Sequence, residues 1–278
     1  MSLHTFPQPR GAFPAIRAVI LAMGFTSLMA WGPKGHTLVA AATLQGLPEG
    51  LRAWYLGREA AFSQASLEPD LWKNQDSTEV WRHRIACETY GGPAKVPLQE
   101  DAAKALVGAW AFERGGQLPW VIARHHQSLV EAFRSGDRPR VTSESGWLCH
   151  YVSDAQVPLH TTRERNGKAT GQKGVHKRWE TDLVAHGVDH LPPPVTLHPP
   201  EDLPAAIAGW IGESYGMIQP LLEADRAAGR EAEADPTSRT AALWALQKQQ
   251  VLRQLDRSAE RSGALILSAW ILAGRLHP

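Results

Sequence analysis

The spacing of apolar residues is the feature that most constrains the fold of this chain. Apolar side chains recur every three or four residues, which places them on one face of a helix. Convincing alternation of the β type is absent, and Gly and Pro gather between the helical runs. The sequence therefore predicts an all-α fold. The runs lie at residues 38–47, 102–112, 120–133, 147–152, 175–184, 207–222 and 241–272.

The size and the C-terminal part of the chain favour one domain. The chain has 278 residues, of which 43% are hydrophobic, enough for one large core. The last apolar run, residues 263–274, is shorter than a membrane-spanning helix and follows a charged amphipathic stretch at residues 248–261. We expect this run to belong to the core of a single mainly helical domain.

The first thirty residues have the composition of a secretory signal peptide. Arg10 and Arg17 occur without any acidic residue, an apolar run follows at residues 18–25, and the segment Ser27-Leu28-Met29-Ala30 ends in a small residue. The alternative interpretation is a buried first helix. We predict that residues 1–30 are a signal peptide and that residues 31–278 form a secreted or periplasmic domain.

The charge and the cysteines restrict the classes of function. Removing Arg10 and Arg17 leaves 27 basic and 28 acidic residues, a formal charge of −1, so no wide basic surface is implied. A polyanion would therefore be held locally, by metal ions. Cys87 and Cys149 either form a disulfide in an exported chain or remain buried free thiols.

A pair of metal-ligand types occurs near the middle of the chain. His150 and Asp154 are four residues apart and lie on one face of a predicted helix. Pro158 should end that helix, because proline disfavours helical geometry at the preceding residue. His160 can then turn back from the following loop toward the same pocket.

A second pair repeats this geometry. His176 and Glu180 are also four residues apart, on a separate helix, and zinc prefers histidine nitrogen together with carboxylate oxygen. Four side chains from two helices, with His160 between them, are more than one tetrahedral ion needs. The spacing therefore predicts a metal cluster, and two ions about 4 Å apart suit phosphoryl chemistry.

A motif at the start of the predicted mature chain resembles that of a known family. Trp31-Gly32-Pro33-Lys34-Gly35-His36 is similar to the Trp-Gly-x-x-Gly-His opening of the single-strand-specific zinc nucleases of the S-one/P-one type. These nucleases share a superfamily with the zinc-dependent bacterial phospholipases C, and the resemblance spans most of residues 31–278. In that family the α-amino nitrogen and the carbonyl oxygen of the first residue chelate zinc, which cleavage before Trp31 would permit.

The resemblance implies a helical fold with three zinc ions. One ion would be bound by Trp31 and His36 with Asp154 as a shared carboxylate. The other two sets are Asp70, His83, His150 and Asp154, and His160, His176 and Glu180.

The same resemblance implies an activity. The chain would be a phosphodiesterase, an endonuclease that cleaves single-stranded DNA or RNA to 5′-phosphate products through a hydroxide shared by two zinc ions. Asp70 would orient this hydroxide or take its proton. Lys73, where the nucleases carry an arginine, would help to neutralise the leaving oxygen, although lysine lacks the bidentate fork of arginine. No stable protein partner is predicted.

Two alternatives remain open at this point. Glu180 occupies a position where the nucleases usually have Asp and the phospholipases have Glu, so a phospholipase C that acts on phospholipid is the second hypothesis. A secreted zinc-binding protein without turnover is the third.

Several other residues near the proposed ligands have two interpretations. The basic loop at residues 161–175 is either solvated or contacts a substrate backbone. The tryptophans beside ligands either form the pocket wall or stack a nucleobase. These tryptophans are Trp72, Trp81, Trp147 and Trp179, and the histidines taken as structural or surface residues are His125, His126, His186, His190 and His198.

Overall fold

The computed structural model describes residues 31–232 and 238–278. All regular secondary structure in this part of the chain is helical, which confirms the all-α prediction. The predicted signal peptide, residues 1–30, lies outside the described residues.

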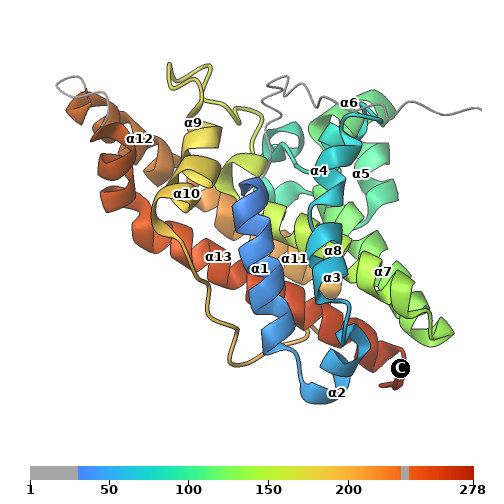
Figure 1. Cartoon of the computed structure of the whole chain (residues 1–278). Coiled ribbons are helices and arrows are strands. Elements are labelled where there is room, and N and C mark those ends of the chain that lie inside the picture. The colour runs from blue at the N-terminus through green and yellow to red at the C-terminus, as the bar shows by residue number, and fades with distance from the viewer. Residues whose placement is uncertain (1–30, 233–237) are drawn as a thin grey trace, which may run out of the picture.

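Four helices form the frame of the molecule (Figure 1). Helix α13 runs along the whole body and packs against the other three, while α7 and α8 lie side by side. Asp137 caps the start of α8 by accepting a hydrogen bond from the Arg140 amide. The helices are α1 (Gly32–Gly46), α7 (Leu118–Ser135), α8 (Arg138–Ala155) and α13 (Arg239–Leu272).

Shorter elements surround this frame. Helix α12 (Ile218–Glu231) packs along α13, and α11 (Leu203–Gly216) packs against α7. The remaining α-helices are α2 (Glu49–Arg52), α3 (Glu59–Ala65), α4 (Glu68–Trp72), α5 (Glu100–Val107), α6 (Ala109–Gly115), α9 (Val175–Lys177) and α10 (Leu183–Gly187). Short turns are η1 (Ala53–Tyr55), η2 (Glu79–Trp81), η3 (Cys87–Tyr90), η4 (Pro93–Lys95), η5 (Pro158–His160) and the π-helical η6 (Arg178–Asp182).

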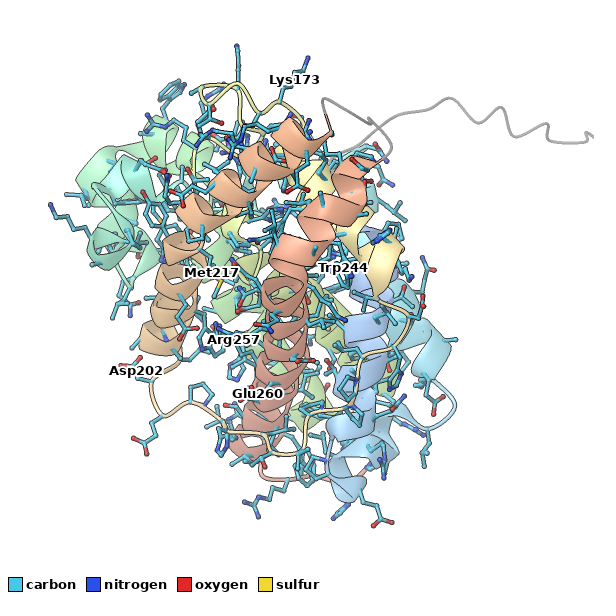
Figure 2. All side chains as sticks on the ribbon, turned by 90° about the vertical axis from the view of Figure 1, so that its left-hand side faces the viewer. Lys173, Asp202, Met217, Trp244, Arg257 and Glu260 are labelled. Atoms are coloured by element: carbon cyan, nitrogen blue, oxygen red, sulfur yellow. The ribbon has the colours of Figure 1, made fainter. Side chains whose placement is uncertain are left out.

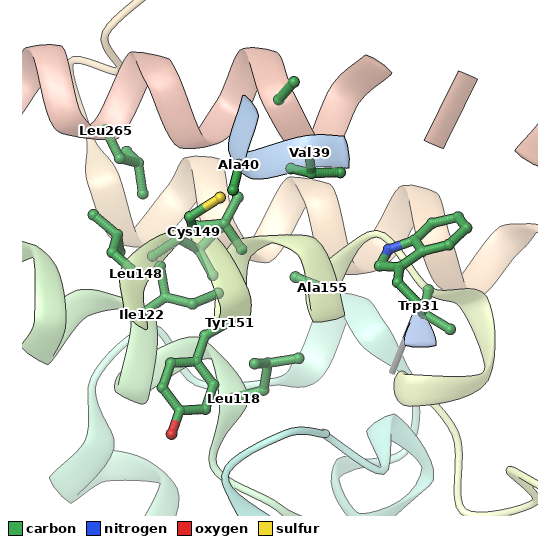
Figure 3. Packing of buried hydrophobic residues seen from close by; sticks show 14 of the residues in the cluster. Trp31, Val39, Ala40, Leu118, Ile122, Leu148, Cys149, Tyr151, Ala155 and Leu265 are labelled. Atoms are coloured by element: carbon green, nitrogen blue, oxygen red, sulfur yellow. The ribbon is translucent and has the colours of Figure 1, made fainter. Parts of the chain in front are cut away.

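The hydrophobic core lies between these four helices. Figure 3 shows Ile122 of α7, Leu148 of α8 and Leu265 of α13 close to Ala40 of α1, all of them fully buried. Burial of each large aliphatic side chain is worth about 1.5–3 kcal/mol relative to exposure, so this contact region dominates the stability of the bundle.

Most of the C-terminal apolar run belongs to this core, as predicted, whereas Ile271 and Leu272 near its end are exposed. Leu265, Ile266 and Ala269 are completely buried in α13. Within the described residues, no helix combines the length and the apolar character needed to cross a membrane.

The two cysteines do not form a disulfide. Cys87 in η3 and Cys149 in α8 are both free and buried, so the free-thiol interpretation is the correct one. Burial raises the pKa of the Cys87 thiol to about 12 and that of the Cys149 thiol to about 11. Both side chains therefore act as small apolar residues.

Candidate metal centre

Side chains from six separate segments meet at one end of α8. Helix α8 supplies His150 and Asp154. It ends at Ala155, and Pro158 follows in η5, where His160 turns back toward the helix. The described residues contain three buried groups that could hold metal ions. They are His36, Asp70 and His150; His83, His150 and Asp154; and His160, His176 and Glu180.

Asp154 is the hub of the centre. Its Oδ2 lies 2.8 Å from His83 Nδ1 and 3.4 Å from His150 Nε2, while its Oδ1 lies 3.7 Å from His36 Nε2. The rings of His36 and His150 stack with centroids 4.1 Å apart. Although burial acts to raise the pKa of Asp154, the charges of His150 and His160 outweigh it, and the pKa lies well below its usual value. Asp154 is therefore a carboxylate that faces two neighbouring groups of ligands.

Asp70 reaches the same ligands from α4. Its Oδ1 lies 3.9 Å from His83 Nδ1 and 4.0 Å from His150 Nε2, and it accepts a hydrogen bond from Lys73. Burial opposes ionisation, but the charges of His150 and Lys73 hold the pKa of Asp70 below its ordinary value. The structure thus brings both Asp70 and Lys73 to the centre, where the sequence analysis expected them.

The third group lies beside the first two. Glu180 Oε2 is 2.9 Å from His176 Nε2 and 3.5 Å from His160 Nε2. His160 Nδ1 donates a hydrogen bond of 2.6 Å to the carbonyl of His83, which ties this group to the one around Asp154. Glu180 sits on the π-helical turn η6, and such turns often occur at functional sites.

Burial governs the protonation of this third group. It lowers the pKa of His176 to about 3 and raises the pKa of Glu180 to about 7. His176 is therefore a neutral imidazole, which is the form that binds a metal.

The ligands are oriented by residues that the sequence analysis did not single out. His150 Nδ1 donates a 2.8 Å hydrogen bond to the carbonyl oxygen of Ser66. Glu79 Oε1 lies 3.3 Å from His83 Nε2, and Glu79 also accepts hydrogen bonds from Tyr151 and Arg82. Hydrogen bonds from outside the centre fix the ring orientation of metal-binding histidines. The four-residue spacing of Glu79 and His83 is a signal that could have revealed this pair.

A group of buried polar atoms has no hydrogen-bond partner among the described residues. Such atoms cost free energy when they are left unsatisfied, and each one calls for an explanation. Their concentration around one point fits bound cations, and nitrogen and carboxylate oxygen are ligand atoms that zinc accepts. At the centre they are both ring nitrogens of His36 and His176, Nε2 of His160, Asp70 Oδ2, Asp154 Oδ1, and both carboxylate oxygens of Glu180.

These groups overlap with the predicted ligand sets without matching them fully. The set of His160, His176 and Glu180 is reproduced. His83, His150 and Asp154 also come together, with Asp70 about 4 Å from both imidazoles. His36 lies near Asp154, but it also groups with Asp70 and His150. The first and second predicted sites are thus contiguous.

The Trp31 motif positions the start of α1 beside α8. The Trp31 indole is fully buried, donates a 2.9 Å hydrogen bond to the carbonyl of Ser153 and packs at 5.1 Å from the ring of Trp179. Gly35 is required here because a Cβ atom would lie 2.8 Å from Trp31 Cβ. Gly32 has a φ angle of 57°, which favours glycine. Coordination by the Trp31 backbone remains a prediction.

The basic loop at residues 161–175 contributes one charge toward the centre. Arg165 is close enough to Glu180 and His176 for its charge to act on both, and burial lowers the pKa of Arg165. Lys173, by contrast, is exposed and projects at the top of the molecule (Figure 2). The sequence analysis had not separated Arg165 from its basic neighbours.

The other histidines and the tryptophans have contacts outside the three groups. His126 lies 3.2 Å from Ser268 Oγ, and His125 lies 2.8 Å from Glu144. Trp179 is fully buried and donates to Gln247, so it belongs to the core. Trp147 donates to Glu68. These contacts favour structural roles.

The chain was compared with known proteins. No known protein family matches it, and no curated protein shows significant similarity to it.

Proposed function

We propose that this chain is a secreted zinc-dependent phosphodiester hydrolase, an endonuclease that acts on single-stranded DNA or RNA and leaves 5′-phosphates. The observation that carries the proposal is the set of three adjoining, buried groups of nitrogen and oxygen ligands, joined through Asp154 and His150. The resemblance of residues 31–36 to the opening of the zinc nucleases supplies the substrate class.

The candidate ligands divide into sets for three zinc ions. Trp31, His36 and Asp154 would hold one ion, Asp70, His83, His150 and Asp154 a second, and the third would lie between His160, His176 and Glu180. When bound, zinc lowers the pKa of water toward neutrality and offsets the charge of a phosphodiester.

Residues of the chain would prepare the attack. Asp70 Oδ1 is occupied by Lys73, whereas Oδ2 is buried without a partner. The low pKa of Asp70 keeps it ionised, so Oδ2 can accept a proton from the attacking water or orient it. Lys73 and Arg165 would add positive charge beside the phosphoryl group as negative charge develops.

The deciding experiment measures hydrolysis by protein beginning at Trp31. Single-stranded DNA, RNA and phosphatidylcholine vesicles are incubated in parallel, with zinc and with chelator. Polynucleotide cleavage that chelator abolishes is expected, and zinc-loaded protein that leaves all single-stranded polymers intact contradicts the proposal.

Asp70→Asn tests the role of the carboxylate in the same assay. Loss of general-base catalysis should lower kcat by about 100-fold or more. Asp101→Asn, which removes an exposed carboxylate on α5, is the matched control and should keep full activity. Activity that Asp70→Asn leaves unchanged would point to a contaminating enzyme, and this chain would then be a zinc-binding protein without turnover.

Phospholipase C activity is the second candidate. The carboxylate of the third group is Glu180, as in the phospholipases, and Leu71 next to Asp70 is 44% exposed. Hydrolysis of phosphatidylcholine without polynucleotide cleavage would select this function instead.

A further inference from the structure

A second concave site includes Arg84, the residue that follows the candidate metal ligand His83. It has a volume of about 330 Å³ and is lined by two tryptophans and three arginines together with small residues. Arg84 follows His83 directly in the chain, and the charge of Arg165 acts both on Arg84 and on Glu180 of the metal centre. The lining residues that carry the argument are Trp81, Arg84, Trp110, Arg114 and Arg163.

Two of the three arginines of this pocket stack on aromatic rings. The Arg84 guanidinium lies 4.5 Å from the centroid of Trp81. Arg114 lies 5.2 Å from the ring of Trp110 and 5.9 Å from that of Trp81. Stacking on aromatic faces leaves the guanidinium edges free to donate hydrogen bonds, and it limits the entropy that a ligand contact would cost.

Positive charge in the pocket lacks a carboxylate to balance it. No acidic residue lines the pocket, and Arg163 is close enough to Arg84 for their charges to repel. The neighbouring Glu88 accepts hydrogen bonds from the Thr162 hydroxyl and the Arg163 amide instead.

A buried donor in the pocket has no hydrogen-bond partner in the part of the chain that the structure describes. Arg84 is only 7% exposed, and its Nε atom makes no hydrogen bond, although its Nη2 donates to the carbonyl of Arg114. A buried charged donor is costly when it is unpaired. An anion in the pocket would satisfy it, and guanidinium groups bind phosphate particularly well.

We propose that this pocket binds a second phosphate of the substrate, next to the phosphate that the metal centre would cleave. The inference rests on the proposed phosphodiesterase function and narrows its substrate to chains with several phosphates. A phospholipid with a single phosphodiester could not occupy both places.

Binding of a ten-nucleotide oligothymidylate tests phosphate binding by the pocket independently of catalysis. The probe carries phosphorothioate linkages, which keep the negative charge and resist cleavage, and its affinity for zinc-loaded protein is measured by fluorescence anisotropy. The variant Arg114→Gln/Arg163→Gln removes two exposed side chains and spares the buried Arg84. We expect at least tenfold weaker binding and a smaller salt dependence, by about 0.7 in the log–log slope per lost phosphate contact.

A matched variant controls for the loss of two charges. Arg52→Gln/Arg140→Gln removes two exposed arginines from α2 and from the first turn of α8, at the other end of the bundle. Its affinity should stay within twofold of the unmodified protein. Equal affinities of the pocket variant and this control would overturn the inference.

Kinetics separate failure of the inference from failure of the proposed function. The ratio of kcat/KM for unmodified decathymidylate to that for the dinucleotide TpT, which has one phosphodiester, should fall about tenfold in the pocket variant. An unchanged ratio refutes the second phosphate site alone. Zinc-loaded protein that cleaves neither substrate refutes the proposed function, and the binding measurement then still decides the pocket.

Discussion

The carboxylate of Asp154 faces two histidines with its two oxygens: Oδ2 lies 2.8 Å from His83 Nδ1, and Oδ1 lies 3.7 Å from His36 Nε2. One side chain therefore joins ligand groups that come from α1 and from the turn after η2. A carboxylate shared by neighbouring metal sites would make the occupancy of each site depend on the other.

Asp154→Asn should remove more metal than a change in the third group. Because Asp154 contacts two groups of ligands, its loss is expected to reduce zinc content by about two ions, whereas His176→Gln should remove one. Zinc per chain is measured by mass spectrometry after dialysis. His190→Gln, at an exposed position, is the control. Loss of the same number of ions in both variants would show that Asp154 does not bridge.

Metal removal should destabilise the fold. Without cations, several buried nitrogen and oxygen atoms of the centre have no hydrogen-bond partner among the described residues. Ligands that bind only the folded state stabilise it by mass action. Zinc at a hundredfold excess over its dissociation constant should contribute about 2.7 kcal/mol for each independent site. Thermal unfolding with zinc and with chelator measures this effect, and equal melting temperatures would rule it out.

Gly35→Ala should disturb the start of α1. The added methyl group would lie 2.8 Å from Trp31 Cβ, and overpacking of this kind costs about 1–3 kcal/mol. Urea unfolding gives the free energy of unfolding. Gly212→Ala is the matched control, since a methyl group there meets no atom within 4 Å and should stabilise α11 by about 0.4–1 kcal/mol. A Gly35→Ala variant as stable as the unmodified protein would contradict the packing described for Trp31.

Acid should weaken the fold partly through His126, which lies away from the metal centre. Burial lowers the pKa of His126 from 6.5 to about 4. The unfolded chain therefore binds more protons than the folded one between these values, and stability falls as pH decreases through this window. A pKa lowered from 6.5 to about 4 corresponds to a loss of about 3 kcal/mol by pH 4, since each pH unit in this window contributes about 1.36 kcal/mol.

His126→Gln isolates this contribution to acid unfolding. Glutamine does not titrate and can still reach Ser268. The free energy of unfolding of the variant should therefore depend less on pH between 6.5 and 4 than that of the unmodified protein. Urea unfolding at several pH values compares the two proteins. Parallel pH profiles would exclude His126 as a source of the acid sensitivity.

Periodicity and proline placement predicted much of the fold. The apolar run at residues 120–133 lies within α7, and most of the run at 263–274 is buried in the last turns of α13, because a 3.6-residue period leaves one continuous apolar face to be covered. Pro158 follows the end of α8, as local backbone sterics require. These are short-range effects, and the sequence alone determines them.

Local spacing also predicted the ligand pairs on one helix, but tertiary packing decided which pairs meet. His150 and Asp154 lie on the same face of α8 because of their four-residue spacing. By contrast, His36 and Asp70 reach them only because α1 and α4 are fixed against α8 by core contacts. The contact of Glu79 with His83 and the pocket that contains Arg84 both depend on contacts between distant segments. Tertiary structure decides them, because side chains become buried and lose their solvent partners only when the chain packs.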